Sequence, residues 1–273
     1  MSTTAATASA QAQAPEEEFR PPSPLEQMLF DLKDLQSVLF RTVYYTFRGK
    51  PNRQHVFEQM FHIGNQSMFF MTVTMAFIGA IIAFQMGLQV KRIIPDMTMV
   101  GAMYLKLLLR DLAASVGAMP LATRVGAGIA AEIGSMVVTD QTDALRMCAA
   151  DPIEYLVVPR FIASVVMGTV VLLLGGMVAY FSGGVVLNVL YDVHWNTYMN
   201  FNQITWGDCA LGFLKCLSYG GCIAVVSSQR GLRTFGGSEG VGIATTEAVV
   251  GSLFSIIMLN FFLSGLGYFV FPA

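Results

Sequence analysis

The chain has 273 residues, of which 54% are hydrophobic and 12% are charged. Ordinary soluble domains carry about 25% charged residues, so this chain lacks the charge that a water-facing surface needs. The net charge of −2 provides no strongly basic surface, which excludes nucleic acid as a partner. The mean hydropathy of +0.58 instead predicts an all-α membrane protein.

The first 49 residues divide into a polar tail and a helix. Residues 1–22 are rich in Ala, Ser, Gln and Pro and contain no apolar core, so they predict a disordered tail rather than a signal or transit peptide. Residues 23–49 predict an amphipathic helix, because apolar residues recur every three or four positions with charged residues between them. Ser23, Pro24 and Glu26 fit a capping box at its start. We expect this helix to lie in the membrane interface; the alternative is a packed soluble helix, for which the sequence provides no soluble domain.

Residues 60–273 predict one transmembrane domain. Five apolar stretches are long enough to cross a bilayer, which takes about 20 residues. They lie near residues 66–90, 99–121, 160–188, 207–228 and 244–270.

Basic residues in the short loops predict the orientation. Nine of them fall on the side that holds the N-terminus: Arg41, Arg48, Lys50, Arg53, Arg124, Arg146, Arg160, Arg230 and Arg233. The other side has only Lys91 and Arg92. The N-terminus and the loop 123–159 are therefore expected in the cytoplasm, and the C-terminus on the opposite side.

The second stretch contains three charged residues, Lys106, Arg110 and Asp111. A charged group at the centre of a membrane helix costs about 2.5 to 3.5 kcal/mol, so we expect these side chains to form a mutual cluster that faces an internal cavity rather than lipid. Two roles stay open at this point: contact with a lipid headgroup, or an ion network that only holds this span to its neighbours.

Motifs for catalysis are absent from the sequence. There is no G-x-x-x-x-G-K-[ST] phosphate loop, so the chain is not expected to hydrolyse ATP. The three histidines form no H-E-x-x-H motif, and the four cysteines have no CxxC spacing. We therefore predict no catalytic residue, no metal and no cofactor. The alternative is a membrane-embedded lipid-modifying enzyme, for which only the charged cluster of the second span offers catalytic candidates.

The loop 123–159 is longer than a connection between spans needs. Thr139 is a candidate cap for a short helix whose first turn holds Asp140 and Asp143, and Pro152 is expected to end it. Such a helix would be a surface that a partner protein could grip. The alternative is a surface loop without a partner.

Two blocks of this sequence resemble a known family. The first runs Arg110-Asp111-Leu112, Arg124-x-Gly126-x-Gly128, Ala131-Glu132-Ile133-Gly134, Asp140-Gln141-x-Asp143-Ala144-Leu145, Asp151-Pro152 and Pro159-Arg160; the second is Gly236 to Thr246. Their order is similar to that in the MlaE (YrbE) permeases of the mammalian-cell-entry (MCE) lipid transport systems. The resemblance covers roughly residues 25 to 270. At Ile243 and Glu247 the family commonly has basic residues instead.

The resemblance implies a multi-pass permease of the bacterial inner membrane that moves phospholipid or a related lipid. It implies as partners an ABC ATPase subunit, an MCE-domain periplasmic protein and a second permease copy, identical or paralogous, with a STAS-domain accessory protein as a further candidate. It also implies that residues 139–147 form a coupling helix on the ATPase. The contacts expected there are Glu132, Asp140, Gln141, Asp143 and Leu145.

Overall fold

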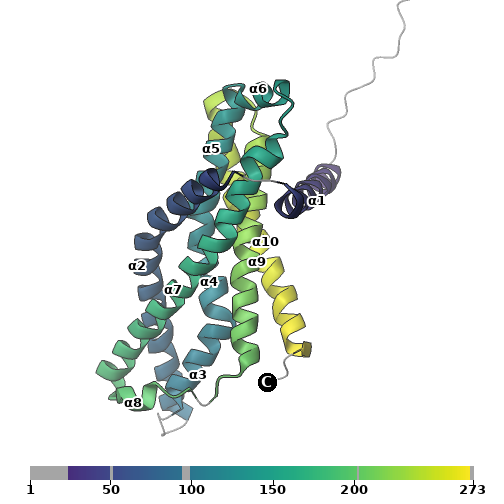
Figure 1. The fold of residues 1–273 in the computed structure, drawn as a ribbon. Coiled ribbons are helices and arrows are strands. Elements are labelled where there is room, and N and C mark those ends of the chain that lie inside the picture. Colours follow the sequence, from purple (N-terminus) through teal and green to yellow (C-terminus); the bar gives the residue numbers. More distant parts are fainter. Residues whose placement is uncertain (1–23, 50–51, 94–98, 202, 271–273) are drawn as a thin grey trace, which may run out of the picture.

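The computed structural model describes residues 24–49, 52–93, 99–201 and 203–270. Every regular element in this part of the chain is helical, as the sequence predicts. The predicted tail and the capping residue Ser23 lie outside the described residues. Figure 1 shows an elongated bundle with helix α6 (Gln141–Met147) at one end and the short helix α8 (Trp195–Tyr198) at the other. We call these the α6 end and the α8 end.

Five helical segments are long and apolar enough to cross a membrane, and the five predicted spans are thereby confirmed. The chain is an integral membrane protein. The segments are Arg53–Arg92, Val100–Val138, Ile153–Tyr191, Trp206–Leu232 and Gly237–Val270. They comprise α2 (Arg53–Ile93), α3 (Val100–Leu107), η1 (Leu108–Leu112), α4 (Ala113–Leu121), η2 (Ala122–Gly126), α5 (Ala127–Val138), η3 (Ile153–Val157), α7 (Val158–Tyr191), α9 (Trp206–Leu232) and α10 (Gly237–Val270), where η marks a π-helical turn.

The second span is much longer than predicted. Residues 123–138, expected to belong to a loop, continue the helix as η2 and α5. Pro120 lies inside this helix, and a π-helical turn, η2, follows it. Gly126 and Gly134 of this stretch are buried and let neighbouring side chains pack closely. The helix therefore carries α6 at its far end.

Helix α1 (Pro24–Arg48) begins where the sequence predicts and lies beside the bundle, on the side of α9 and α10 (Figure 1). Val38 and Thr42 are buried against the bundle. Tyr45 donates a hydrogen bond of 3.0 Å to the Asp151 carboxylate. This bond also raises the pKa of the Tyr45 phenol above its ordinary value. Asp34 forms a longer ion pair of 3.7 Å with Arg233, which directly follows α9.

The core at the α8 end is built on a close approach of two spans. Gly79 of α2 lies directly against the backbone of Ala179 in α7, where any Cβ would collide. Buried Tyr104 donates to both carbonyl oxygens, at 3.1 Å to Gly79 and 3.0 Å to Ala179. Helices inside a membrane are not driven together by the hydrophobic effect. The small residues here instead let the two backbones come close enough for direct contact.

Candidate functional site

Two of the three charged residues singled out in the second span, Arg110 and Asp111, pair with α9 rather than with one another. Arg110 Nη1 lies 3.2 Å from Asp208 Oδ1, and Lys215 Nζ donates to Asp111 Oδ1 at 2.7 Å. Lys106, one turn away, is partly exposed and has no hydrogen-bond or ion-pair partner among the described residues. The expected mutual cluster of these three side chains is therefore wrong, because Arg110 and Asp111 each find an opposite charge on the neighbouring span while Lys106 pairs with neither of them.

A π-helical turn lies at this point of the second span. Consecutive residues of an α-helix point about 100° apart, so Arg110 and Asp111 would not both be expected to reach one neighbour. The π-helical turn η1, which contains both, lies against α9, and Gly212 allows the contact. A Cβ at Gly212 would collide with the carbonyl oxygen of Leu109. Turns of this kind are frequent at functional sites.

The lysine of α9 is the centre of a wider polar network. Lys215 is 1% exposed, and its Nζ also donates to Ser264 Oγ of α10 at 2.7 Å. Ser264 donates to Asn260 Oδ1 at 3.2 Å, and Tyr219 donates to the same oxygen at 3.0 Å. The network thus joins the second, fourth and fifth spans.

The two outer members of this charge cluster are accessible. The side chain of Asp111 is 39% exposed and that of Arg110 is 22% exposed, whereas Lys215 and Asp208 are almost fully buried. A carboxylate and a guanidinium thus present free polar surface within a candidate membrane span, where lipid tails would offer no partner. Buried opposite charges hold both in place.

Sequence reasoning missed Asp208 and Lys215. Two signals were available. Charges in an otherwise apolar span are costly and seldom accidental. The two residues are also seven positions apart, which places them on one helix face. Asp208 additionally closes a capping box with Thr205 at the start of α9.

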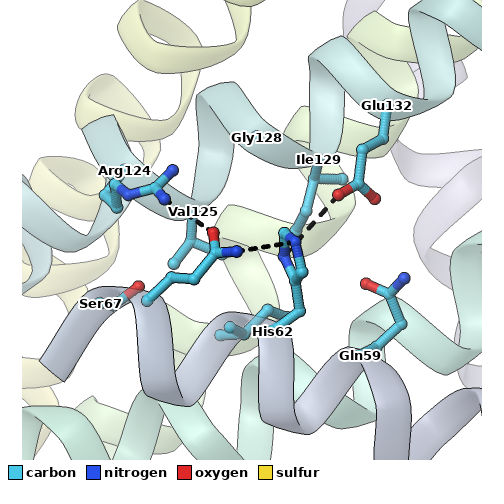
Figure 2. A pocket seen from close by; sticks show the side chains of 10 residues that line it. Gln59, His62, Ser67, Arg124, Val125, Gly128, Ile129 and Glu132 are labelled. Atoms are coloured by element: carbon cyan, nitrogen blue, oxygen red, sulfur yellow. Dashed lines mark hydrogen bonds and ion pairs between the residues drawn. The ribbon is translucent and has the colours of Figure 1, made fainter.

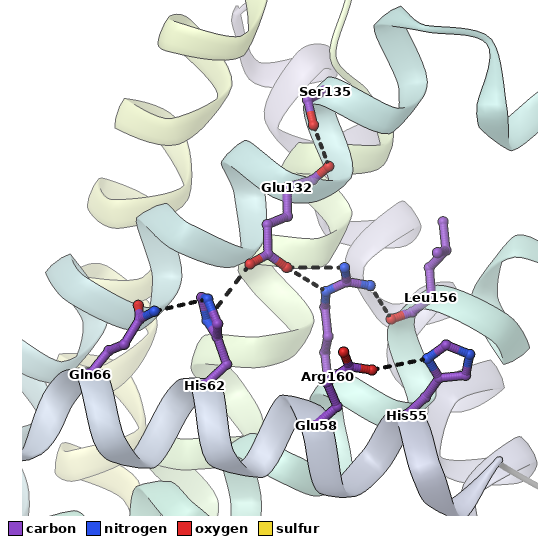
Figure 3. Close-up of polar contacts among 8 residues, drawn as sticks. All are labelled: His55, Glu58, His62, Gln66, Glu132, Ser135, Leu156 and Arg160. Atoms are coloured by element: carbon purple, nitrogen blue, oxygen red, sulfur yellow. Dashed lines mark hydrogen bonds and ion pairs between the residues drawn. The ribbon is translucent and has the colours of Figure 1, made fainter.

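A second polar cluster lies nearer the α6 end and contains Glu132, one of the predicted ATPase contacts. Its carboxylate accepts hydrogen bonds from Arg160 Nε at 3.3 Å and Nη2 at 3.0 Å (Figure 3). His62 Nδ1 of α2 lies 3.8 Å from its other oxygen. Arg160 is buried and also donates to the Leu156 carbonyl at 2.9 Å. The structure therefore gives Glu132 internal partners in the first and third spans.

A small cavity of about 30 Å³ lies between α2 and α5 in the same region. Figure 2 shows His62, Arg124 and Glu132 around it. Gln66 links them: its Nε2 lies 2.9 Å from His62 Nε2, and its Oε1 accepts from Arg124 Nη2 at 2.7 Å. The cavity has room for water but not for a lipid headgroup.

The remaining predicted ATPase contacts lie on or next to α6. Asp140, Gln141 and Asp143 are exposed, and Leu145 is partly buried. Asp143 pairs with Arg146 at 3.0 Å within the helix. The exposed end of the bundle therefore presents carboxylates, an amide and an apolar edge.

Two details of α6 differ from the prediction. The residue before the helix is Asp140, in a left-handed conformation with φ of 57°, while the Thr139 hydroxyl donates back to the Ser135 carbonyl at 2.9 Å. Thr139 is thus not its cap. The helix ends at Met147, well before Pro152, which instead precedes η3. The short helix with Asp143 in its first turn is confirmed.

The described residues contain no group of three or more His, Cys, Asp or Glu that could hold a metal ion. The four cysteines form no disulfide with one another. The fold and the site thus define a multi-span membrane protein with buried ion pairs between its spans.

Comparison with known proteins gives the family. The family model for the permease MlaE matches residues 56–266, and the chain belongs to this family. A probable ABC transporter permease protein of Synechocystis sp., slr1045, is 40% identical over 226 residues, which cover 81% of this chain and 85% of that protein. A probable ABC transporter permease protein of Rickettsia bellii is 31% identical and covers 87% of this chain and 89% of its own length. Protein TRIGALACTOSYLDIACYLGLYCEROL 1, chloroplastic, of Arabidopsis thaliana is 31% identical over 82% of this chain and 64% of that protein.

Proposed function

We propose that this chain is the permease subunit of an ABC-type MCE lipid transporter. It moves phospholipid or a related lipid between the inner membrane and a periplasmic MCE-domain protein, and a separate ATPase supplies the energy. The observation that carries the proposal is the accessible pair Arg110 and Asp111 at membrane depth, held by buried Asp208 and Lys215.

A lipid-transport cavity accounts for this exposure. Facing lipid tails, the pair would add a cost of about 2.5 to 3.5 kcal/mol for each charge. Facing a cavity, the Arg110 guanidinium can donate two parallel hydrogen bonds to a headgroup phosphate. Lys106 adds a second cation one turn away, and Asp111 keeps the net charge low enough for the lipid to leave again.

The relatives support the transporter class. Two of them are named as probable ABC transporter permeases, and the Arabidopsis relative is named after trigalactosyldiacylglycerol. This chain has no phosphate loop, so a partner must hydrolyse the ATP. The family resemblance adds a second permease copy, the MCE-domain protein and a STAS-domain accessory protein as partners.

The α6 end fits a docking surface for the ATPase. Asp140, Gln141 and Asp143 are exposed there for direct contact, and Leu145 offers an apolar edge. Glu132 would act at a distance, because its carboxylate is engaged with Arg160. The continuous helix from Val100 to Val138 links this surface to the charge cluster. The distribution of basic residues supports an orientation with the α6 end and the N-terminus in the cytoplasm and the C-terminus in the periplasm.

The experiment uses Lys106, whose loss leaves no described partner unpaired. The permease is reconstituted with its ATPase and MCE-domain protein, and transfer of a fluorescent phospholipid to the MCE-domain protein is followed. We expect Lys106→Met to reduce transfer without changing thermal stability or ATPase binding, while Lys33→Met, at an exposed site on α1, leaves transfer unchanged. Wild-type transfer by Lys106→Met would contradict the cavity assignment.

A further inference from the structure

An apolar groove of about 530 Å³ runs beneath α1. It is separate from the charge cluster and lies where α1 faces α7 and α9. Leu39, Val43 and Phe47 of α1 line one wall, and Phe161, Leu217 and Val225 line the other. Its volume falls within the range of about 300 to 1,000 Å³ that is typical of ligand pockets.

The two hydroxyl groups in the lining are already satisfied within their own helices. The Ser218 hydroxyl donates to the Leu214 carbonyl at 2.8 Å, and the Thr46 hydroxyl donates to the Thr42 carbonyl at 2.7 Å. An extended peptide or a sugar in the groove would therefore leave its own hydrogen-bonding groups without partners, which is costly. The occupant must be apolar over the length that it buries.

The other faces of α1 indicate how such an occupant is oriented. Val38 and Thr42 are buried against the bundle, while Phe40 and the groove residue Phe47 are exposed. Arg41 and Arg48 are also exposed, and the helical period places them on the side away from the apolar stripe. A molecule with an apolar chain and an anionic head matches this order of faces, because its chain would meet apolar side chains and its head would meet arginines.

The groove also continues toward the α8 end. A second apolar cavity, of about 350 Å³, lies between α9 and α10 and includes Leu214 and Leu266. Leu217 lines both cavities, so the two meet at this residue. Together they form an apolar track along α9, on a different face from Lys215.

We propose that the groove beneath α1 is a binding site for a phospholipid, with an acyl chain against α9 and the headgroup phosphate at Arg41 and Arg48. The site holds one lipid next to the permease, outside the charge cluster. This binding needs neither ATP nor the ATPase, so it stands or falls separately from the transport function proposed above.

The test uses a phosphatidylglycerol that carries a photoactivatable diazirine on its acyl chain. The full-length permease is placed in nanodiscs containing this lipid, irradiated without nucleotide, and digested to map the adducts by mass spectrometry. We expect adducts in residues 35–47 and 217–226. Ser218→Trp should fill the groove and remove them. Its control is Thr72→Trp, at an exposed hydroxyl that likewise donates to the carbonyl four residues earlier, at 2.8 Å to Met68.

A second variant, on a different helix, shows whether the loss of adducts comes from filling the groove or from misfolding of the first variant. Val43→Trp fills the groove from the α1 side and should also remove the adducts. Arg41→Gln combined with Arg48→Gln should lower the yield by weakening the hold on the headgroup. The proposal is overturned if the wild type gives no adducts in these segments, if the adducts survive both tryptophan variants, or if a second copy of the chain is cross-linked there in place of lipid.

Discussion

The pair of Lys215 and Asp111 gives an asymmetric prediction for stability. Lys215 is 1% exposed, so its ammonium depends on Asp111 and Ser264 for all of its described hydrogen bonds. Asp111→Asn removes the opposing charge and leaves the lysine buried. Loss of one partner of a buried ion pair costs about 3 to 5 kcal/mol.

The reverse change should be much milder. Lys215→Met fills the same space with an apolar chain and leaves Asp111, which is 39% exposed and still accepts a hydrogen bond from Ser115 at 2.9 Å. If the free side of Asp111 faces water in a cavity, the loss should be only about 1 kcal/mol. The double variant should be more stable than Asp111→Asn alone, because no buried charge is left unpaired.

The measurement is equilibrium unfolding of the four proteins in mixed micelles, with thermal unfolding in nanodiscs as a second readout. Equal losses for the two single variants would refute the reasoning, because they would mean that Asp111 faces lipid and is stranded without Lys215. Simple additivity in the double variant would refute the proposed coupling of the two charges.

Three further outcomes follow from other contacts. Gly212→Ala should destabilise the protein by about 1 to 3 kcal/mol, since its methyl group meets the backbone of η1. The control Gly265→Ala has open space around it and should leave stability unchanged. Thermal unfolding of the two variants is the measurement. Asp143→Lys should abolish co-purification of the ATPase at an unchanged melting temperature of the permease, because Asp143 is exposed. Normal co-purification would show that Asp143 does not belong to the docking surface. Glu132→Ala should lower stability by about 2 to 3 kcal/mol by stranding Arg160, whereas an unchanged melting temperature would mean that this pair does not brace the spans.

The spans could be predicted because a bilayer demands one property over a long window. About 20 apolar residues suffice, and the five segments exceed that length even where Arg110 and Asp111 interrupt one of them. The extension of the second span to Val138 could not be predicted in this way. Its glycines and polar residues resemble those of a loop, and only packing against neighbouring helices reveals that Gly126 and Gly134 are contact points.

The charge cluster was found only in part for a related reason. Arg110 and Asp111 stood out because they are adjacent, but their partners are 98 and 104 residues away along the chain. A single sequence carries no direct signal for such distant pairing. Asp208 and Lys215 were further concealed because each is one charge in a span that is apolar on average. The short helix α6 was predictable in position but not in its cap, since the left-handed turn at Asp140 depends on how α5 ends.

The central claim is that this chain is a transport subunit driven by a separate ATPase. The most direct measurement reconstitutes the permease in liposomes with its ATPase and MCE-domain protein, and follows ATP hydrolysis together with phospholipid transfer to the MCE-domain protein. We predict no hydrolysis by the permease alone, and transfer that requires both the ATPase and ATP. Hydrolysis by the permease alone, or lipid transfer at the same rate without ATP, would contradict the account.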